Sequence, residues 1–213
     1  KVLVLRPRRE LVPLASPTLF LDATAESRIF EIVLGDAFEF YEITARRSGR
    51  VVQIGNALMN ITALRGARGQ EYIEKIQRLI DRSSEAGRTG VILTYRDMKD
   101  RFQVPQGWKI DHFGALRGTN KYAGMNTAVI VGRWQLPPTA IEDKVAALVS
   151  STELEPDMSG AQTKEVRGYR MRDGSLLGKN VTVYTDRIWQ AFNEQSREAE
   201  LEQAVDRLRL VWS

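Results

Sequence analysis

The chain has 213 residues, of which 43% are hydrophobic and 27% charged, the composition of a folded globular protein rather than a disordered one. It contains no cysteine and one histidine, which excludes disulfides, thiolate metal sites, iron–sulfur clusters, a cysteine nucleophile and multi-histidine metal centres. A net charge of +4 allows a polyanionic partner without requiring one. No apolar run is long enough to cross a membrane, and residues 1–6 are too short an apolar stretch for a signal peptide, so we expect a cytoplasmic protein.

The pattern of apolar residues in the first half predicts two short strands, a helix and a longer strand. Apolar runs at Thr18–Leu21 and Arg50–Ile54 have the length and composition of buried strands. Isoleucines and leucines recur on one face of Glu71–Glu85, which predicts an amphipathic helix that ends at a glycine. The apolar run Gly90–Tyr95 then predicts the next strand.

The second half continues the alternation. The expected elements are, in chain order, a strand at Thr127–Val131, a helix from Pro137-Pro138 to about Leu148, a loop at Ser150–Lys164, strands at Val166–Met171 and Val181–Tyr184 around a turn at Asp173-Gly174, and a long helix from Asp186 onward. Strands that alternate with helices predict an α/β fold with a largely parallel sheet covered by helices on both faces.

Two arginine-bearing segments of the second half point to an anionic ligand. The first, Ala115–Asn120, contains Arg117-Gly118-Thr119-Asn120 and precedes a predicted strand. The second, Glu200–Arg209, carries Gln203, Arg207 and Arg209 on the last predicted helix. Arginine is permanently charged and directs two donors at a phosphate. A loop and a helix of this kind could face one ligand from two sides, which indicates a nucleoside triphosphate, a nucleic-acid backbone, or both.

The same segments resemble motifs of a known family. Arg117-Gly118-Thr119-Asn120 resembles motif V of the superfamily 2 helicases, and Gln203-x-x-x-Arg207 resembles motif VI. Leu21-Asp22-Ala23-Thr24-Ala25 is similar to motif III, and Val91–Tyr95 stands where motif IV would be. The order along the chain is the order in the family, and the nearest resemblance is to helicases of plasmids, phages and the excision-repair type.

The resemblance implies a fold, partners and roles for individual residues. It implies the second RecA-like lobe of a helicase in residues 36–213, with residues 1–35 as the end of the first lobe or a joining strand, and hence a fragment of a longer chain. ATP and Mg²⁺ would be bound mainly by the missing N-terminal lobe, and the other partner would be single-stranded DNA or RNA, with no membrane. The implied roles are arginine fingers for Arg207 and Arg209, nucleotide binding for Gly118, Asn120 and Gln203, coupling for Asp22 and Thr24, and nucleic-acid binding for Thr94, Tyr95, Arg96 and Arg117.

The sequence also departs from the family pattern. Asn120 replaces the usual aspartate, and Asp206 stands where motif VI has glycine. Arg209 is the second residue after Arg207, whereas the family has its second arginine at the third. Gly174–Asn180 is a near miss of a phosphate-binding loop, with one residue too few between its glycines, and we interpret it as a hairpin turn.

The same residues also allow purely structural roles. The helix arginines could pair with acidic side chains at helical spacing on a solvated face, and Gly118 with Asn120 could form a plain turn. Asp22 and Thr24 could cap a helix, and His112 beside Asp111 is more typical of a structural histidine than of a catalytic dyad. The alternative function is a non-catalytic α/β module that binds nucleic acid or protein.

Overall fold

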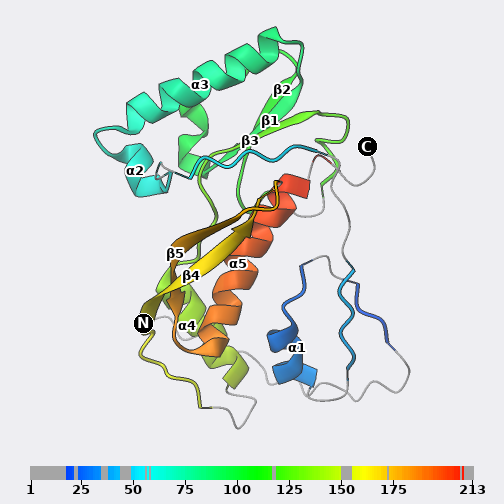
Figure 1. The fold of residues 1–213 in the computed structure, drawn as a ribbon, viewed down its shortest axis with the longest axis vertical. Coiled ribbons are helices and arrows are strands. Elements are labelled where there is room, and N and C mark those ends of the chain that lie inside the picture. Colours follow the sequence, from blue (N-terminus) through cyan, green and yellow to red (C-terminus); the bar gives the residue numbers. More distant parts are fainter. Residues whose placement is uncertain are drawn as a thin grey trace. The chain divides into compact units, whose positions relative to one another are not determined.

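The structure, a computed structural model, describes residues 18–21, 24–34, 38–43, 49–55, 57, 59–116, 119–149, 155–171, 173–206 and 208. Its elements are α1 (Ser27–Leu34), α2 (Ile61–Arg65), α3 (Gly69–Glu85), β1 (Gly90–Thr94), the 3-10 helix η1 (Arg96–Arg101), β2 (Trp108–His112), β3 (Thr127–Ile130), α4 (Pro138–Val149), β4 (Gln162–Arg170), β5 (Leu176–Tyr184) and α5 (Arg187–Asp206) (Figure 1). They fall into two compact units, which we call the sheet unit (residues 41–135 and 196–213) and the hairpin unit (residues 1–40 and 136–195). The expected division of the chain at residue 35 stays a prediction.

The sheet unit is built on three parallel strands in the order β2-β1-β3. The central strand β1 is buried at all five positions, because a strand pairs with it on each side and side chains cover both of its faces. Thr94 pairs with His112 and Leu93 with Ile130, so the three carboxyl ends meet at one edge of the sheet. The chain passes from β1 to one neighbour and then returns to the other side of β1. In open α/β sheets, ligands bind at the carboxyl edge beside such a reversal of strand order.

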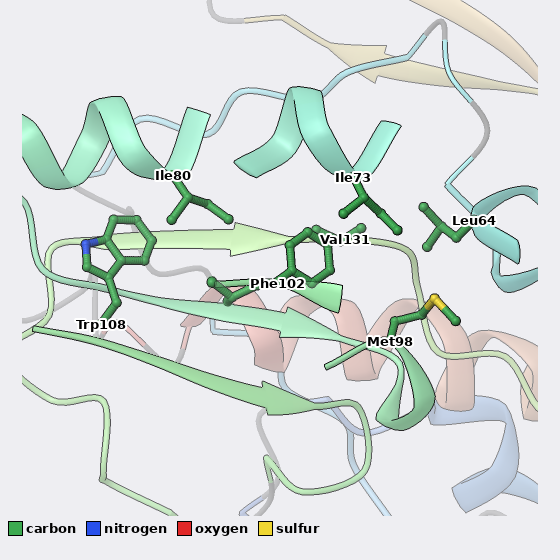
Figure 2. Close-up of a cluster of buried hydrophobic side chains, with 8 residues drawn as sticks. Leu64, Ile73, Ile80, Met98, Phe102, Trp108 and Val131 are labelled. Atoms are coloured by element: carbon green, nitrogen blue, oxygen red, sulfur yellow. The ribbon is translucent and has the colours of Figure 1, made fainter. Parts of the chain in front are cut away.

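Helix α3 covers one face of this sheet. Its residues Ile73 and Ile80, together with Leu64 of α2, pack against Ile92 of β1, and Trp108 closes the cluster at the amino end of the strands (Figure 2). The indole Nε1 of Trp108 donates a hydrogen bond of 2.9 Å to the backbone carbonyl of Arg88, so the buried polar atom is satisfied. The isoleucine spacing that predicts a helix over Glu71–Glu85 is the spacing of this buried face.

The opposite face is covered by the β2–β3 connection and by the end of α5. Val91 and Leu93 of β1 form a second cluster with Leu116, Tyr122 and Ala204, which we call the loop-face cluster. Helices therefore lie on both faces of the parallel sheet. The expected α/β class, a parallel sheet with helices packed on it, is confirmed.

The hairpin unit contains α1, α4, the first half of α5 and the antiparallel pair β4–β5. Tyr184 at the end of β5 packs with Trp189 of α5 and Ile141 of α4 in a third cluster. The Oδ1 atom of Asp186 accepts hydrogen bonds from the backbone amides of Ile188 at 2.8 Å and Trp189 at 3.1 Å, which explains why α5 begins here. Because β5 starts at Leu176 after a glycine turn, Gly174–Asn180 is confirmed as part of a hairpin.

Two strand predictions are wrong, and one strand was missed. Thr18–Leu21 and Arg50–Ile54 form no strand, and their apolar side chains are exposed, with Leu21 at 85% and Ile54 at 60%. A short apolar run has the composition of a strand, but it becomes one only where a neighbouring strand accepts its hydrogen bonds. The missed strand is β2, whose polar residues at alternate positions resemble a loop.

Candidate functional site

The connection between β2 and β3 carries the first arginine-bearing segment. Leu116 and Tyr122 are 0% and 1% exposed, and both belong to the loop-face cluster. We call the described residues between them, 119–121, the excursion, which leads directly into the fully buried Tyr122. Arg117 and Gly118 lie outside the described residues, whereas Asn120 is exposed and its carbonyl accepts a hydrogen bond of 3.0 Å from the amide of Ala123. The excursion therefore ends in a hydrogen-bonded turn that presents Asn120 at the surface.

A buried carboxylate ties this excursion to β2. Asp111 is 6% exposed, and its Oδ2 atom accepts hydrogen bonds from the hydroxyl of Tyr122 at 2.5 Å and from Nζ of Lys121. Its Oδ1 atom accepts the backbone amide of His112 at 2.9 Å. Lys109 lies two residues before Asp111 on the same face of β2, and its Nζ atom donates a hydrogen bond of 2.8 Å to the backbone carbonyl of Lys121. We call Asp111, Lys121 and Tyr122 the carboxylate lock.

The lock is charged at neutral pH. Burial would raise the pKa of Asp111, but the hydrogen bonds from Lys121 and Tyr122 outweigh it and lower the pKa to about 2. Burial, together with the hydrogen bond to Asp111, raises the pKa of Tyr122 to about 12. The hydrogen bond to Asp111 also raises the pKa of Lys121. The lock thus holds an aspartate anion, a lysine cation and a neutral tyrosine.

The second arginine-bearing segment reaches the same cluster from α5. Ala204 is 0% exposed and packs with Leu116 and Tyr122, and Leu208 packs partly buried against them. Gln203 precedes Ala204 and is half-buried. Arg207 and Arg209 lie outside the described residues, although they flank Leu208 in the sequence. Two segments that are far apart along the chain therefore share one cluster on one face of the sheet.

The end of β1 carries the residues expected to bind nucleic acid. Thr94 is fully buried, and within the described part of the chain its hydroxyl has no hydrogen-bond partner. Arg96 follows at the start of η1 and is exposed. In this conformation a phosphate could reach Arg96, whereas the hydroxyl of Thr94 has no open route to solvent.

Tyr95, between these two residues, is half-buried and closes over the end of β3. Its hydroxyl accepts a hydrogen bond of 3.3 Å from the backbone amide of Arg133, and its ring packs edge-on against Phe113 at 5.5 Å. Gly132 has φ +90°, and a Cβ atom there would lie 2.4 Å from the Tyr95 ring. Glycine at this position therefore lets β1 and β3 come together at their carboxyl ends.

The imidazole of His112 lies beside Asp111 without forming a hydrogen bond to it. Nδ1 of His112 is 3.1 Å from Oδ1 of Asp111 but is not aligned as a hydrogen bond. Lys121 and Tyr122 donate hydrogen bonds to the other oxygen, so the side-chain hydrogen bonds of Asp111 go to these two residues and not to the imidazole. Asp22 lies outside the described residues, and Thr24 is half-buried in a turn before α1 in the hairpin unit.

The carboxylate lock is the part of the site that sequence reasoning missed. Its signal was weak: an aspartate in a segment where polar and apolar residues alternate, and a Lys-Tyr pair directly after Asn120. Among the described residues, no group of three or more His, Cys, Asp or Glu side chains is arranged to hold a metal ion. None of the helices in the described ranges is long and apolar enough to cross a membrane.

Comparison with protein-family models, with curated proteins and with solved structures finds no match to this chain.

Proposed function

We propose that this chain is the second RecA-like lobe of an ATP-dependent superfamily 2 nucleic-acid helicase. The observation that carries the proposal is the convergence of the motif V-like and motif VI-like segments, since Leu116, Tyr122 and Ala204 pack in one cluster. That cluster lies on a parallel sheet with helices on both faces, which is compatible with a RecA-like lobe.

The proposed chemistry is phosphoryl transfer in which this lobe stabilises charge. ATP and Mg²⁺ would be bound mainly by the first lobe, while Arg207 and Arg209 approach the γ-phosphate as arginine fingers. Gly118, Asn120 and Gln203 would bind the nucleotide from the two converging segments. Asn120 is exposed on its excursion, and an amide side chain can both donate to and accept from a ribose hydroxyl.

The proposed nucleic-acid surface lies at the carboxyl edge of the sheet. Arg96 is exposed there and would grip the phosphates of a single strand together with Arg117. Tyr95, the residue before Arg96, would contribute as well, and the buried Thr94 could touch the nucleic acid only if the end of β1 opened. A translocating motor must accept any sequence, which favours contacts to the backbone over contacts to the bases.

The deciding experiment is the substitution Arg207→Ala in the full-length protein that contains this lobe, with ATP turnover and single-stranded DNA binding measured side by side. An arginine finger acts in the transition state, so turnover should fall by about 10³-fold while DNA affinity changes little. Arg187→Ala, at an exposed position in the first turn of α5, is the matched control and should leave both unchanged. Near-normal turnover of Arg207→Ala would favour the non-catalytic binding module instead.

A further inference from the structure

The carboxylate lock has more polar chemistry than packing of the loop requires. Leu116 and Tyr122, which lie before and after the excursion in the sequence, already bury apolar surface. The lock adds an anion that is 6% exposed and a cation whose side chain is 45% exposed. Replacing a buried ion pair with apolar residues of similar size is often neutral or stabilising, so a buried carboxylate with its lysine is weak evidence for stability alone.

The lock does supply hydrogen bonds, which are directional and can fix the orientation of the backbone. Packing of Leu116 and Tyr122 limits where the excursion lies, but apolar contacts are not directional. The two hydrogen bonds to Oδ2 of Asp111 come from consecutive residues, Lys121 and Tyr122, and therefore set the orientation of the backbone at that point. Asn120 is the residue immediately before them, and its carbonyl closes the turn to Ala123.

Two further contacts hold the lock in place from β2, and a third lies between two of its own residues. The remaining carboxylate oxygen accepts the amide of His112, which leaves the Asp111 side chain little freedom to rotate. Lys109 donates to the carbonyl of Lys121, so β2 contacts the excursion through its backbone as well. The ammonium of Lys121 also lies 5.1 Å from the centre of the Tyr122 ring.

We propose that Asp111 is a positioning residue, which fixes Lys121 and Tyr122 so that Asn120 is held in the orientation that binds the nucleotide. This inference rests on the proposed function for its ligand, but the positioning itself concerns only the sheet unit. Asp111 does not touch the nucleotide in this scheme and acts through the two residues that follow Asn120.

The test uses Asp111→Asn, which keeps the shape of the side chain and removes its charge, and the pair Lys121→Met and Lys121→Arg. The first readout is hydrogen exchange of the Ala123 amide in the 213-residue chain. Exchange should be roughly tenfold faster in Asp111→Asn and Lys121→Met, since a charge-assisted hydrogen bond is lost, and Lys121→Arg should restore the wild-type rate. Lys75→Met removes an exposed lysine that pairs with Glu71 at 2.5 Å on α3 and should change nothing.

The second readout is steady-state ATP turnover by the full-length protein. Asp111→Asn and Lys121→Met should raise the KM for ATP about tenfold with a smaller change in kcat, whereas Lys121→Arg should keep the wild-type KM. Unchanged Ala123 exchange in Asp111→Asn would overturn the positioning role, whatever the turnover. Faster exchange with an unchanged KM would also overturn it, because the orientation would then be irrelevant to the nucleotide. Absence of ATP turnover in the wild-type protein would instead contradict the proposed function, and the exchange result would still decide whether Asp111 orders the loop.

Discussion

The ionisation of Asp111 should make the stability of the protein depend on pH in a defined window. Its pKa is lowered from the ordinary value of 3.8 to about 2 by the hydrogen bonds that outweigh burial. A carboxyl whose pKa is lower in the folded state than in the unfolded state stabilises the fold above the unfolded pKa, and the stabilisation disappears as the pH falls through the folded pKa. The difference between 3.8 and about 2 corresponds to about 2 kcal/mol, at 1.36 kcal/mol for each pH unit.

The perturbation is Asp111→Asn, and the assay is urea unfolding followed by circular dichroism and tryptophan fluorescence at several pH values. At pH 7 the variant should have a free energy of unfolding lower than wild type by about 2 kcal/mol. Between about pH 4 and pH 2 the difference between the two proteins should shrink toward zero, because wild-type Asp111 becomes protonated. Comparing the two proteins at each pH removes the effect of the other carboxyl groups.

Asp97→Asn is the matched control within the sheet unit. Asp97 forms an ion pair of 2.5 Å with Arg65, but its side chain is 60% exposed, so solvent screens the interaction. Its removal should cost no more than about 1 kcal/mol. If Asp111→Asn were as stable as wild type at pH 7, or if the difference stayed constant down to pH 2, the hydrogen bonds of the lock would not be stabilising the anion and the reasoning would fail.

Three further predictions address other parts of the site. Arg96→Ala should weaken binding of single-stranded DNA equally for all sequences and reduce the salt dependence by about 0.7, the share of one phosphate; unchanged affinity and salt dependence in a fluorescence titration would contradict the nucleic-acid surface. Gly132→Ala should destabilise the protein by more than about 2 kcal/mol in urea unfolding, because the new Cβ atom would meet the Tyr95 ring at 2.4 Å. Gly114→Ala, also at a positive φ but with nothing within 4 Å, is its control and should cost about 1 kcal/mol. The 213-residue chain by itself should hydrolyse no ATP, since its sequence has no phosphate-binding loop, and metal-dependent turnover that follows the chain through purification would refute the lobe assignment.

Much of the local structure was predictable from the amino-acid sequence. Three signals each act over a few residues: the isoleucine spacing of Glu71–Glu85, the proline pair before α4 and the Asp-Gly turn between β4 and β5. The structure has a helix, a helix and a hairpin at these three positions. The two arginine-bearing segments were also visible, because charge and loop chemistry are properties of residue type. Local signals suffice for these features, since helix periodicity, caps and turns depend on neighbours in the chain.

The tertiary structure decided which apolar runs became strands and which segments met. Thr18–Leu21 has a strand-like composition and stays exposed, whereas β2 carries a buried aspartate and still pairs along its whole length with β1. A strand is completed by hydrogen bonds to residues distant in sequence, and no pattern within five residues specifies them. The same holds for the site: Asp111 is buried because Lys121 and Tyr122 satisfy its charge, and Leu116 meets Ala204 because β1 buries both of its faces. Residue type thus determined the candidate chemistry, and long-range packing decided which of those residues share a face of the sheet.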